Sequence, residues 1–119
     1  MWGSAQTKSA CSWIQLQHVE QLDEIEKKSI EVPIIILKHS TRCSHSAMAK
    51  NRLEIYWDKE IPMLPYYLDL LTYRSISDEI AKRYNIVHQS PQVLLFKNGQ
   101  CIYHASHHEI NYNQLKSLI

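Results

Sequence analysis

Residues 34–46, IIILKHSTRCSHS, determine how the rest of the chain is arranged. The segment begins with four aliphatic residues, a pattern typical of a strand that is buried on both faces of a sheet. A short polar turn at residues 40–42 follows, and from Ser44 onward the composition is that of a helix. Cys43 is therefore expected at the junction between a buried strand and a helix. The positive end of the helix and the adjacent Arg42 both favour the thiolate over the thiol.

Length and composition restrict the class of protein. With 119 residues the chain is long enough for one domain with a single core. Its 13 basic and 12 acidic side chains nearly balance, so neither a nucleic-acid partner nor a membrane surface is expected. The longest aliphatic run is too short to span a membrane, and residues 1–8 hold no apolar core of a signal peptide. The odd, sparse set of three cysteines fits a reducing cytoplasm better than a secreted disulfide framework.

The hydrophobic periodicities along the chain predict alternating strands and helices. Residues 1–12 are polar and are expected to form an N-terminal tail before a domain of residues 13–119. Asn98-Gly99 is the strongest hairpin signal in the sequence. The expected strands are residues 13–16, 32–38, 63–71, 92–97 and 100–105; the expected helices are residues 19–29, residues 44–57, a segment opened by a capping box at Ser75 to Asp78, and a segment starting at Asn111.

This order of elements predicts an α/β fold. A parallel βαβ unit followed by an antiparallel hairpin gives a central mixed sheet with helices on both faces. The order is similar to that of the thioredoxin-like three-layer fold. In such a sheet the strand before Cys43 ends at the edge where the sites of α/β proteins form. Cys43 is therefore the first candidate for a functional residue.

Several segments resemble the monothiol bacilliredoxins, glutaredoxin-like proteins of the thioredoxin superfamily that act with bacillithiol. The resemblance is carried by residues 39–46, HSTRCSHS, and by residues 77–92, which end in HQSPQ. It continues through the Asn98-Gly99 turn to residues 108–111, HEIN, and covers the chain from about Trp13 to the end. The family usually has a proline and an aliphatic residue directly after the cysteine, where this chain has serine and histidine.

The resemblance implies that Cys43 is the catalytic nucleophile of a monothiol site. Ser46 occupies the position at which a dithiol enzyme keeps its second cysteine, and the Ser90-Pro91 peptide bond is expected to be cis and to face Cys43. Plainer interpretations stay open, because Thr41 and Ser46 could simply cap the helix. The residues expected to bind substrate or to stabilise the thiolate are Thr41, Arg42, His45, Ser46, Ser90 and Pro91.

Neither of the other two cysteines is expected to resolve a disulfide on Cys43. Cys101 should face Phe96 across the hairpin, and Phe96 is five residues, or about 17 Å at strand rise, from Pro91. A disulfide requires Cα atoms within about 7 Å. Cys11 precedes a first strand that should run parallel to the second, which places it near the opposite edge of the sheet. These positions predict monothiol chemistry.

A thiolate without an internal partner can attack a mixed disulfide and must then be released by a second small thiol. The resemblance implies S-thiolated cytosolic proteins as substrates, bacillithiol rather than glutathione as co-substrate, and no bound cofactor or metal. Two alternatives remain. One is a non-catalytic thioredoxin-fold module that binds a protein partner; the other is a metal site of His39, Cys43 and His45, whose spacing matches no zinc template.

Overall fold

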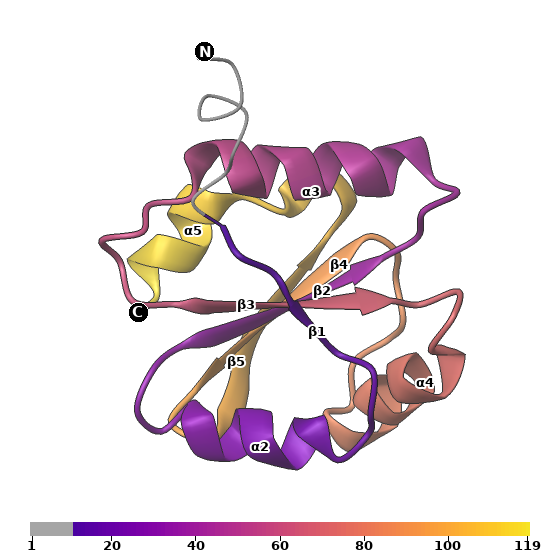
Figure 1. The fold of residues 1–119 in the computed structure, drawn as a ribbon, viewed down its shortest axis with the longest axis horizontal. Helices are drawn as coiled ribbons and strands as arrows, with labels where there is room; N and C mark the ends of the chain where they lie inside the picture. The colour runs from indigo at the N-terminus through magenta and orange to yellow at the C-terminus, as the bar shows by residue number, and fades with distance from the viewer. Residues whose placement is uncertain (1–10) are drawn as a thin grey trace.

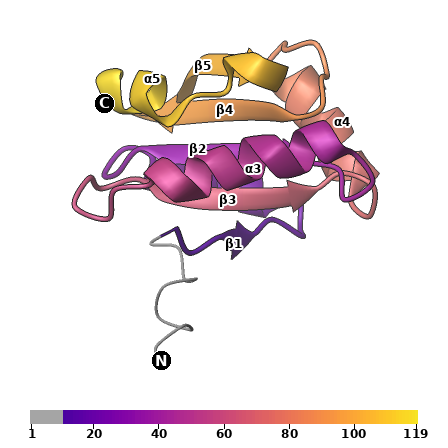
Figure 2. The same ribbon diagram turned by 90° about the horizontal axis from the view of Figure 1, so that it is seen from above.

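The aliphatic run after Pro33 forms the central strand of a mixed β-sheet. The computed structural model describes residues 11–119 and places this sheet between two layers of helices (Figure 1, Figure 2). The elements follow the order β1 (Ile14–Gln15), α2 (Gln21–Lys28), β2 (Ile34–His39), α3 (Ser44–Tyr56), β3 (Leu64–Asp69), α4 (Arg74–Arg83), β4 (Gln92–Lys97), β5 (Gln100–Ser106), the 3-10 turn η1 (His107–Glu109) and α5 (Tyr112–Ser117).

Strand pairing brings three chain segments to one edge of the sheet. The strand order is β1-β3-β2-β4-β5, with β2 parallel to β3 and antiparallel to β4. His39 pairs with Asp69 and Lys38 pairs with Gln92, so β2 and β3 end at the edge where β4 begins. The turn that follows β2 and the segment that precedes β4 therefore meet at this edge. The predicted thioredoxin-like α/β fold is confirmed.

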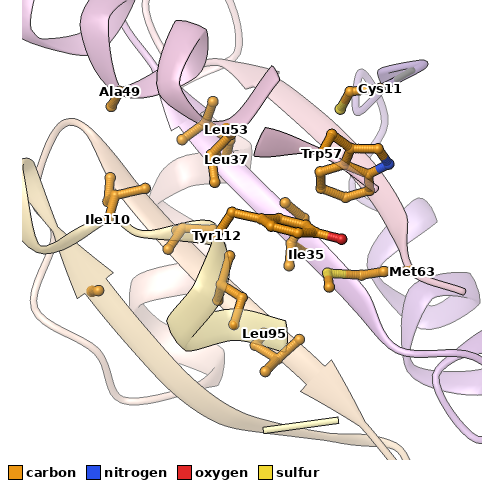
Figure 3. Packing of buried hydrophobic residues seen from close by; sticks show 13 residues of the cluster. Cys11, Ile35, Leu37, Ala49, Leu53, Trp57, Met63, Leu95, Ile110 and Tyr112 are labelled. Carbon is orange, nitrogen blue, oxygen red and sulfur yellow. The ribbon is translucent and has the colours of Figure 1, made fainter. Parts of the chain in front are cut away.

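Side chains of β2 alternate between two apolar clusters, one on each face of the sheet. Ile35 and Leu37 pack under α3 and α5 with residues such as Leu53 and Tyr112 (Figure 3). Ile34 and Ile36 join the cluster on the face that α2 and α4 cover. Every residue of β2 is buried, which explains why its first four residues are all aliphatic and do not alternate with polar ones.

Several local predictions are confirmed by the structure. Asn98 and Gly99 have φ values of 55° and 83°, the two positive angles that a type I′ hairpin turn requires. At the last helix the side chain of Asn111 accepts a hydrogen bond of 3.1 Å from the backbone N–H of Gln114. Residues 1–10, most of the predicted tail, lie outside the described residues, whereas Cys11 is buried against the cluster under α3.

The predicted capping box at Ser75 to Asp78 is wrong. The N-cap of helix α4 lies two residues earlier, at Tyr73, which makes no side-chain capping bond, and the helix begins at Arg74. The preceding turn is instead held by Asp69, whose carboxylate accepts hydrogen bonds from the N–H of Leu71 and the hydroxyl of Thr72. Because these bonds fix where the helix starts, Ser75 lies inside the first turn and cannot cap it.

Among residues 11–119, one charged side chain lies fully inside the protein. Lys38 points away from α3, and its Nζ lies 3.4 Å from the carbonyl oxygen of Ser77 and 3.4 Å from Nδ1 of His88. Burial lowers the pKa of this ammonium group from 10.5 to about 8, against the opposing attraction of Asp78. Lys38 thereby joins β2 to α4 and to the segment that leads into β4.

We expect Lys38→Met to gain stability over the parent at neutral pH and to lose that advantage in alkali. Below pH 8 the lysine is charged in both states, and the folded state bears the cost of burying the charge. Between pH 8 and 10.5 only the unfolded chain keeps the proton, so the parent becomes relatively more stable as pH rises. Urea unfolding of both proteins at several pH values should show the difference changing by about 3 kcal/mol over this range. A difference that does not vary with pH would contradict the buried ammonium.

Candidate functional site

Cys43 lies at the N-cap of α3, directly after the turn that ends β2. Its backbone is extended, with φ −111° and ψ 120°, and its N–H donates to the carbonyl of Ser40 at 3.1 Å. The carbonyl of Cys43 accepts the first helical bond from Ala47 at 3.2 Å. The turn is tightened by Ser40, whose hydroxyl accepts from the N–H of Arg42. The thiol is free and half-exposed at the edge of the sheet.

The first turn of α3 lowers the pKa of the Cys43 thiol below its ordinary value. The largest contribution is a hydrogen bond from the backbone N–H of Ser46, and the N–H of His45 and the Ser46 hydroxyl add to it, while partial burial opposes them. Arg42 and Thr41 are exposed on the turn, so their predicted roles stay predictions. The His45 residue acts on the thiolate through its backbone, and its ring is exposed.

The pKa values of the other two thiols are raised rather than lowered. Burial, with the nearby charge of Glu54, raises the pKa of Cys11 to about 12. Burial also raises the pKa of Cys101, whose sulfur donates to the carbonyl of Tyr103. Cys43 is thus the one cysteine of the three that is favoured as a thiolate.

Both of these cysteines lie far from Cys43. Cys101 pairs with Phe96, which pairs with Ile34 at the start of β2, about 17 Å at strand rise from the end of that strand. Cys11 lies near Trp57, alongside the C-terminal half of α3 that carries Glu54 (Figure 3), whereas Cys43 precedes the N-terminal end of this helix. The length of α3 separates its two ends by about 20 Å. Neither thiol is placed to form a disulfide with Cys43.

The segment before β4 supplies the second side of the site. The Ser90-Pro91 peptide bond is cis, as predicted. The hydroxyl groups of Ser90 and Ser46 lie 3.5 Å apart, which joins this segment to the first turn of α3. Of the predicted site residues, Cys43, Ser46, Ser90 and Pro91 therefore come together across the edge of the sheet.

His39, a ligand in the alternative metal site, contacts Tyr67 rather than Cys43. Its ring is only 6% exposed and lies against Tyr67, with Nδ1 3.0 Å from the tyrosine hydroxyl. Burial, with the positive charge of Lys50, lowers the pKa of His39. Within residues 11–119 no three His, Cys, Asp or Glu side chains are grouped in a way that could hold a metal ion. The alternative of a metal site finds no support in this geometry.

A groove at the first turn of α3 could not be recognised from the sequence pattern alone. A hollow of about 270 Å³ lies between α3 and η1, and its lining residues are His45, Met48, Arg52, His107 and His108. The sequence pattern of the His107-His108 pair is that of an exposed loop, and nothing local marks Arg52. The spacing of His45 and Arg52, seven residues on one helix, places both on the same face and was the available signal.

Comparisons with known proteins agree with this geometry. The family model for monothiol bacilliredoxin BrxC matches residues 14–115. A solved structure described as a candidate oxidoreductase with a thioredoxin fold is 33% identical, with a TM-score of 0.77 over 87% of this chain and 90% of that chain.

More distant solved structures share the fold. A mutant thioredoxin from Halobacterium salinarum NRC-1 is 18% identical, with a TM-score of 0.69 over 95% of this chain and 92% of its own. Mitochondrial thioredoxin 3 from Saccharomyces cerevisiae is 20% identical, with a TM-score of 0.67 over 90% of this chain and 92% of its own. Across residues 11–119 the helices are all too short or too polar to cross a membrane.

We expect Ser46→Ala to raise the pKa of Cys43 and His45→Ala to leave it unchanged. The serine contributes its hydroxyl, which the substitution removes, whereas the histidine contributes a backbone N–H that alanine retains. The rate of iodoacetamide alkylation against pH, with the modified cysteine identified by mass spectrometry, measures both. Equal displacement of the two curves would contradict the assignment to the Ser46 hydroxyl.

Proposed function

The chain belongs to the monothiol bacilliredoxin family, and on this premise we propose that it removes bacillithiol from mixed disulfides on cytosolic proteins, with Cys43 as the nucleophile. Its general function is thiol redox chemistry, in keeping with the family and with the thioredoxin fold. One observation carries the proposal furthest: Cys43 alone of the three cysteines has a lowered pKa, and it lies beside the cis Ser90-Pro91 bond.

The exchange takes place in two steps, each of which breaks one disulfide and forms another. The Cys43 thiolate attacks the bacillithiol sulfur of a protein mixed disulfide, and the protein thiolate leaves and takes a proton from water. A second bacillithiol thiolate then attacks the bacillithiol sulfur held on Cys43, which releases the Cys43 thiolate and oxidised bacillithiol. The disulfide bond leaves the protein as oxidised bacillithiol, and Cys43 returns to its starting state. No bound cofactor is therefore needed.

The proposed partners are an S-thiolated protein and a small thiol. Bacillithiol is proposed over glutathione because of the family, and a cytoplasmic location is proposed because the exchange requires a pool of reduced thiol. The edge of the sheet beside Pro91 is the proposed contact for the substrate backbone, together with Ser90, Ser46 and the turn that carries Thr41 and Arg42.

A second candidate is a thioredoxin-fold module that binds a partner without turnover. The serine and histidine that follow Cys43, in place of the residues usual in the family, favour this alternative. The two functions differ in one observable. An exchange protein forms a small-thiol adduct on Cys43 that excess small thiol releases, whereas a binding module does not turn over.

We expect Cys43→Ser to abolish release of bacillithiol from a model mixed disulfide, while Cys11→Ala and Cys101→Ala retain it. The reason is the lowered pKa of Cys43 and the distance of the other thiols from it. Release of the small thiol, followed by mass spectrometry of the model protein, measures the rate. A comparable loss in Cys101→Ala would defeat the monothiol mechanism.

We expect the parent protein to act faster on a bacillithiol mixed disulfide than on the glutathione mixed disulfide of the same protein. The expectation rests on family membership. Mixing equal amounts of the two disulfides and following each by mass decides the matter. Faster removal of glutathione would make glutathione the co-substrate.

A further inference from the structure

A monothiol protein must select which of two sulfurs it attacks. Attack on the small-thiol sulfur releases the protein substrate, whereas attack on the protein sulfur leaves Cys43 bonded to the substrate. Which sulfur is attacked depends on access and on how the disulfide is held. A site that holds the body of the small thiol next to Cys43 would direct attack to the productive sulfur.

The groove between α3 and η1 has the right position for such a site. His45 lines it from the same helical turn whose backbone N–H groups bind the Cys43 thiolate. On the opposite wall His107 donates its backbone N–H to the carbonyl of Pro91 at 3.0 Å. The groove is therefore bounded by the two segments that form the thiol site.

The polar side chains of this groove are all cationic groups or hydrogen-bond donors. Arg52 and three histidines line it together with Met48, and no carboxylate does. The neighbouring Glu109 lines an adjoining hollow, which shares His108 with the groove. The groove therefore offers positive charge and hydrogen-bond donors to an anionic ligand.

Arg52 holds a charge that the protein leaves unpaired. Its Nη2 atom lies 3.4 Å from the backbone carbonyls of both His107 and Ile110, which fixes the guanidinium against η1. Throughout the part of the chain that the structure describes, no carboxylate lies within salt-bridge distance of it, although Arg83 is paired with Asp23, Glu26 and Glu79. A fixed guanidinium without a carboxylate partner is suited to bind one from a ligand.

The position of the two histidines depends on an uncommon backbone conformation. His107 has φ 56°, in the left-handed region that few non-glycine residues adopt. Its ring Nε2 lies 3.1 Å from the side-chain oxygen of Gln89, in the segment that leads to the cis bond. The turn at His107 thus presents both histidines to the groove while remaining tied to the thiol site.

We propose that this groove, lined by His45, Arg52, His107 and His108, binds the carboxylate groups of the small thiol and so directs Cys43 to the small-thiol sulfur. Bacillithiol and glutathione both carry carboxylates apart from the thiol, so the recognised chemistry is shared by the two. This inference rests on the proposed exchange function and adds the residues that select the co-substrate.

The test compares two mixed disulfides, one with free carboxylates and one with its carboxylates esterified, and the Arg52 variants separate the effect of charge from that of the added ethyl groups. One model peptide carries glutathione and the other carries glutathione diethyl ester, whose carboxylates are esterified. We expect the parent protein to act on the glutathione form about three- to tenfold faster, the range of one exposed charge-assisted contact. Arg52→Gln should bring this ratio close to one, and Arg52→Lys should restore part of it. Lys82→Gln, which removes a positive charge from the opposite face of the sheet, should leave the ratio unchanged.

The outcomes separate the groove from the exchange function. A ratio near one in the parent, or the same ratio in Arg52→Gln as in the parent, would overturn the proposal. So would an equal fall in both rates, because Arg52 would then only hold η1 in place. Titration of Cys43→Ser with S-methylglutathione and its diethyl ester, followed by the NMR signals of His45 and His108, tests the groove without exchange. Absence of exchange on both peptides and on the bacillithiol mixed disulfide would refute the proposed function, and the NMR titration would still decide whether the groove binds carboxylates.

Discussion

The site depends on the pairing of β2 with strands of both directions. Parallel pairing with β3 and antiparallel pairing with β4 place the end of β2 beside the start of β4, so that two segments far apart in sequence meet at one edge. The thiol of Cys43 follows the first segment and the cis Ser90-Pro91 bond lies in the second. Because β2 is buried on both faces, packing against two apolar clusters fixes its register with β3 and β4. The register in turn fixes where the end of β2 meets the start of β4.

The largest contribution to activation of the thiol comes from a backbone N–H group. Helix α3 leaves the N–H groups of its first turn without helical partners, and two of these, from His45 and Ser46, stabilise the Cys43 thiolate. The same chain raises the pKa of its other two thiols by burying them. The selectivity for one cysteine of three therefore arises from where each lies in the fold, and a monothiol mechanism uses this separation.

Polar contacts with β2, β4 and η1 hold the segment that precedes β4 at the edge of the sheet. The buried Lys38 reaches His88, the side chain of Gln92 donates to the carbonyl of Val87, and η1 is tied to Pro91 by its backbone. Burying the ammonium group of Lys38 costs free energy of folding. In this position the same group connects the central strand to the segment before β4.

The sequence by itself determined those features that depend on neighbouring residues. The buried strand, Cys43 at the start of a helix, the Asn98-Gly99 turn and the cap at Asn111 each depend on a few consecutive residues, and the succession of strands and helices indicates a mixed sheet covered by helices. Only the tertiary structure decided how distant side chains meet. Arg52 reaches η1, Lys38 reaches His88, and Asp69 takes over the turn before α4 from the predicted capping box, because packing sets these contacts and no local pattern encodes them.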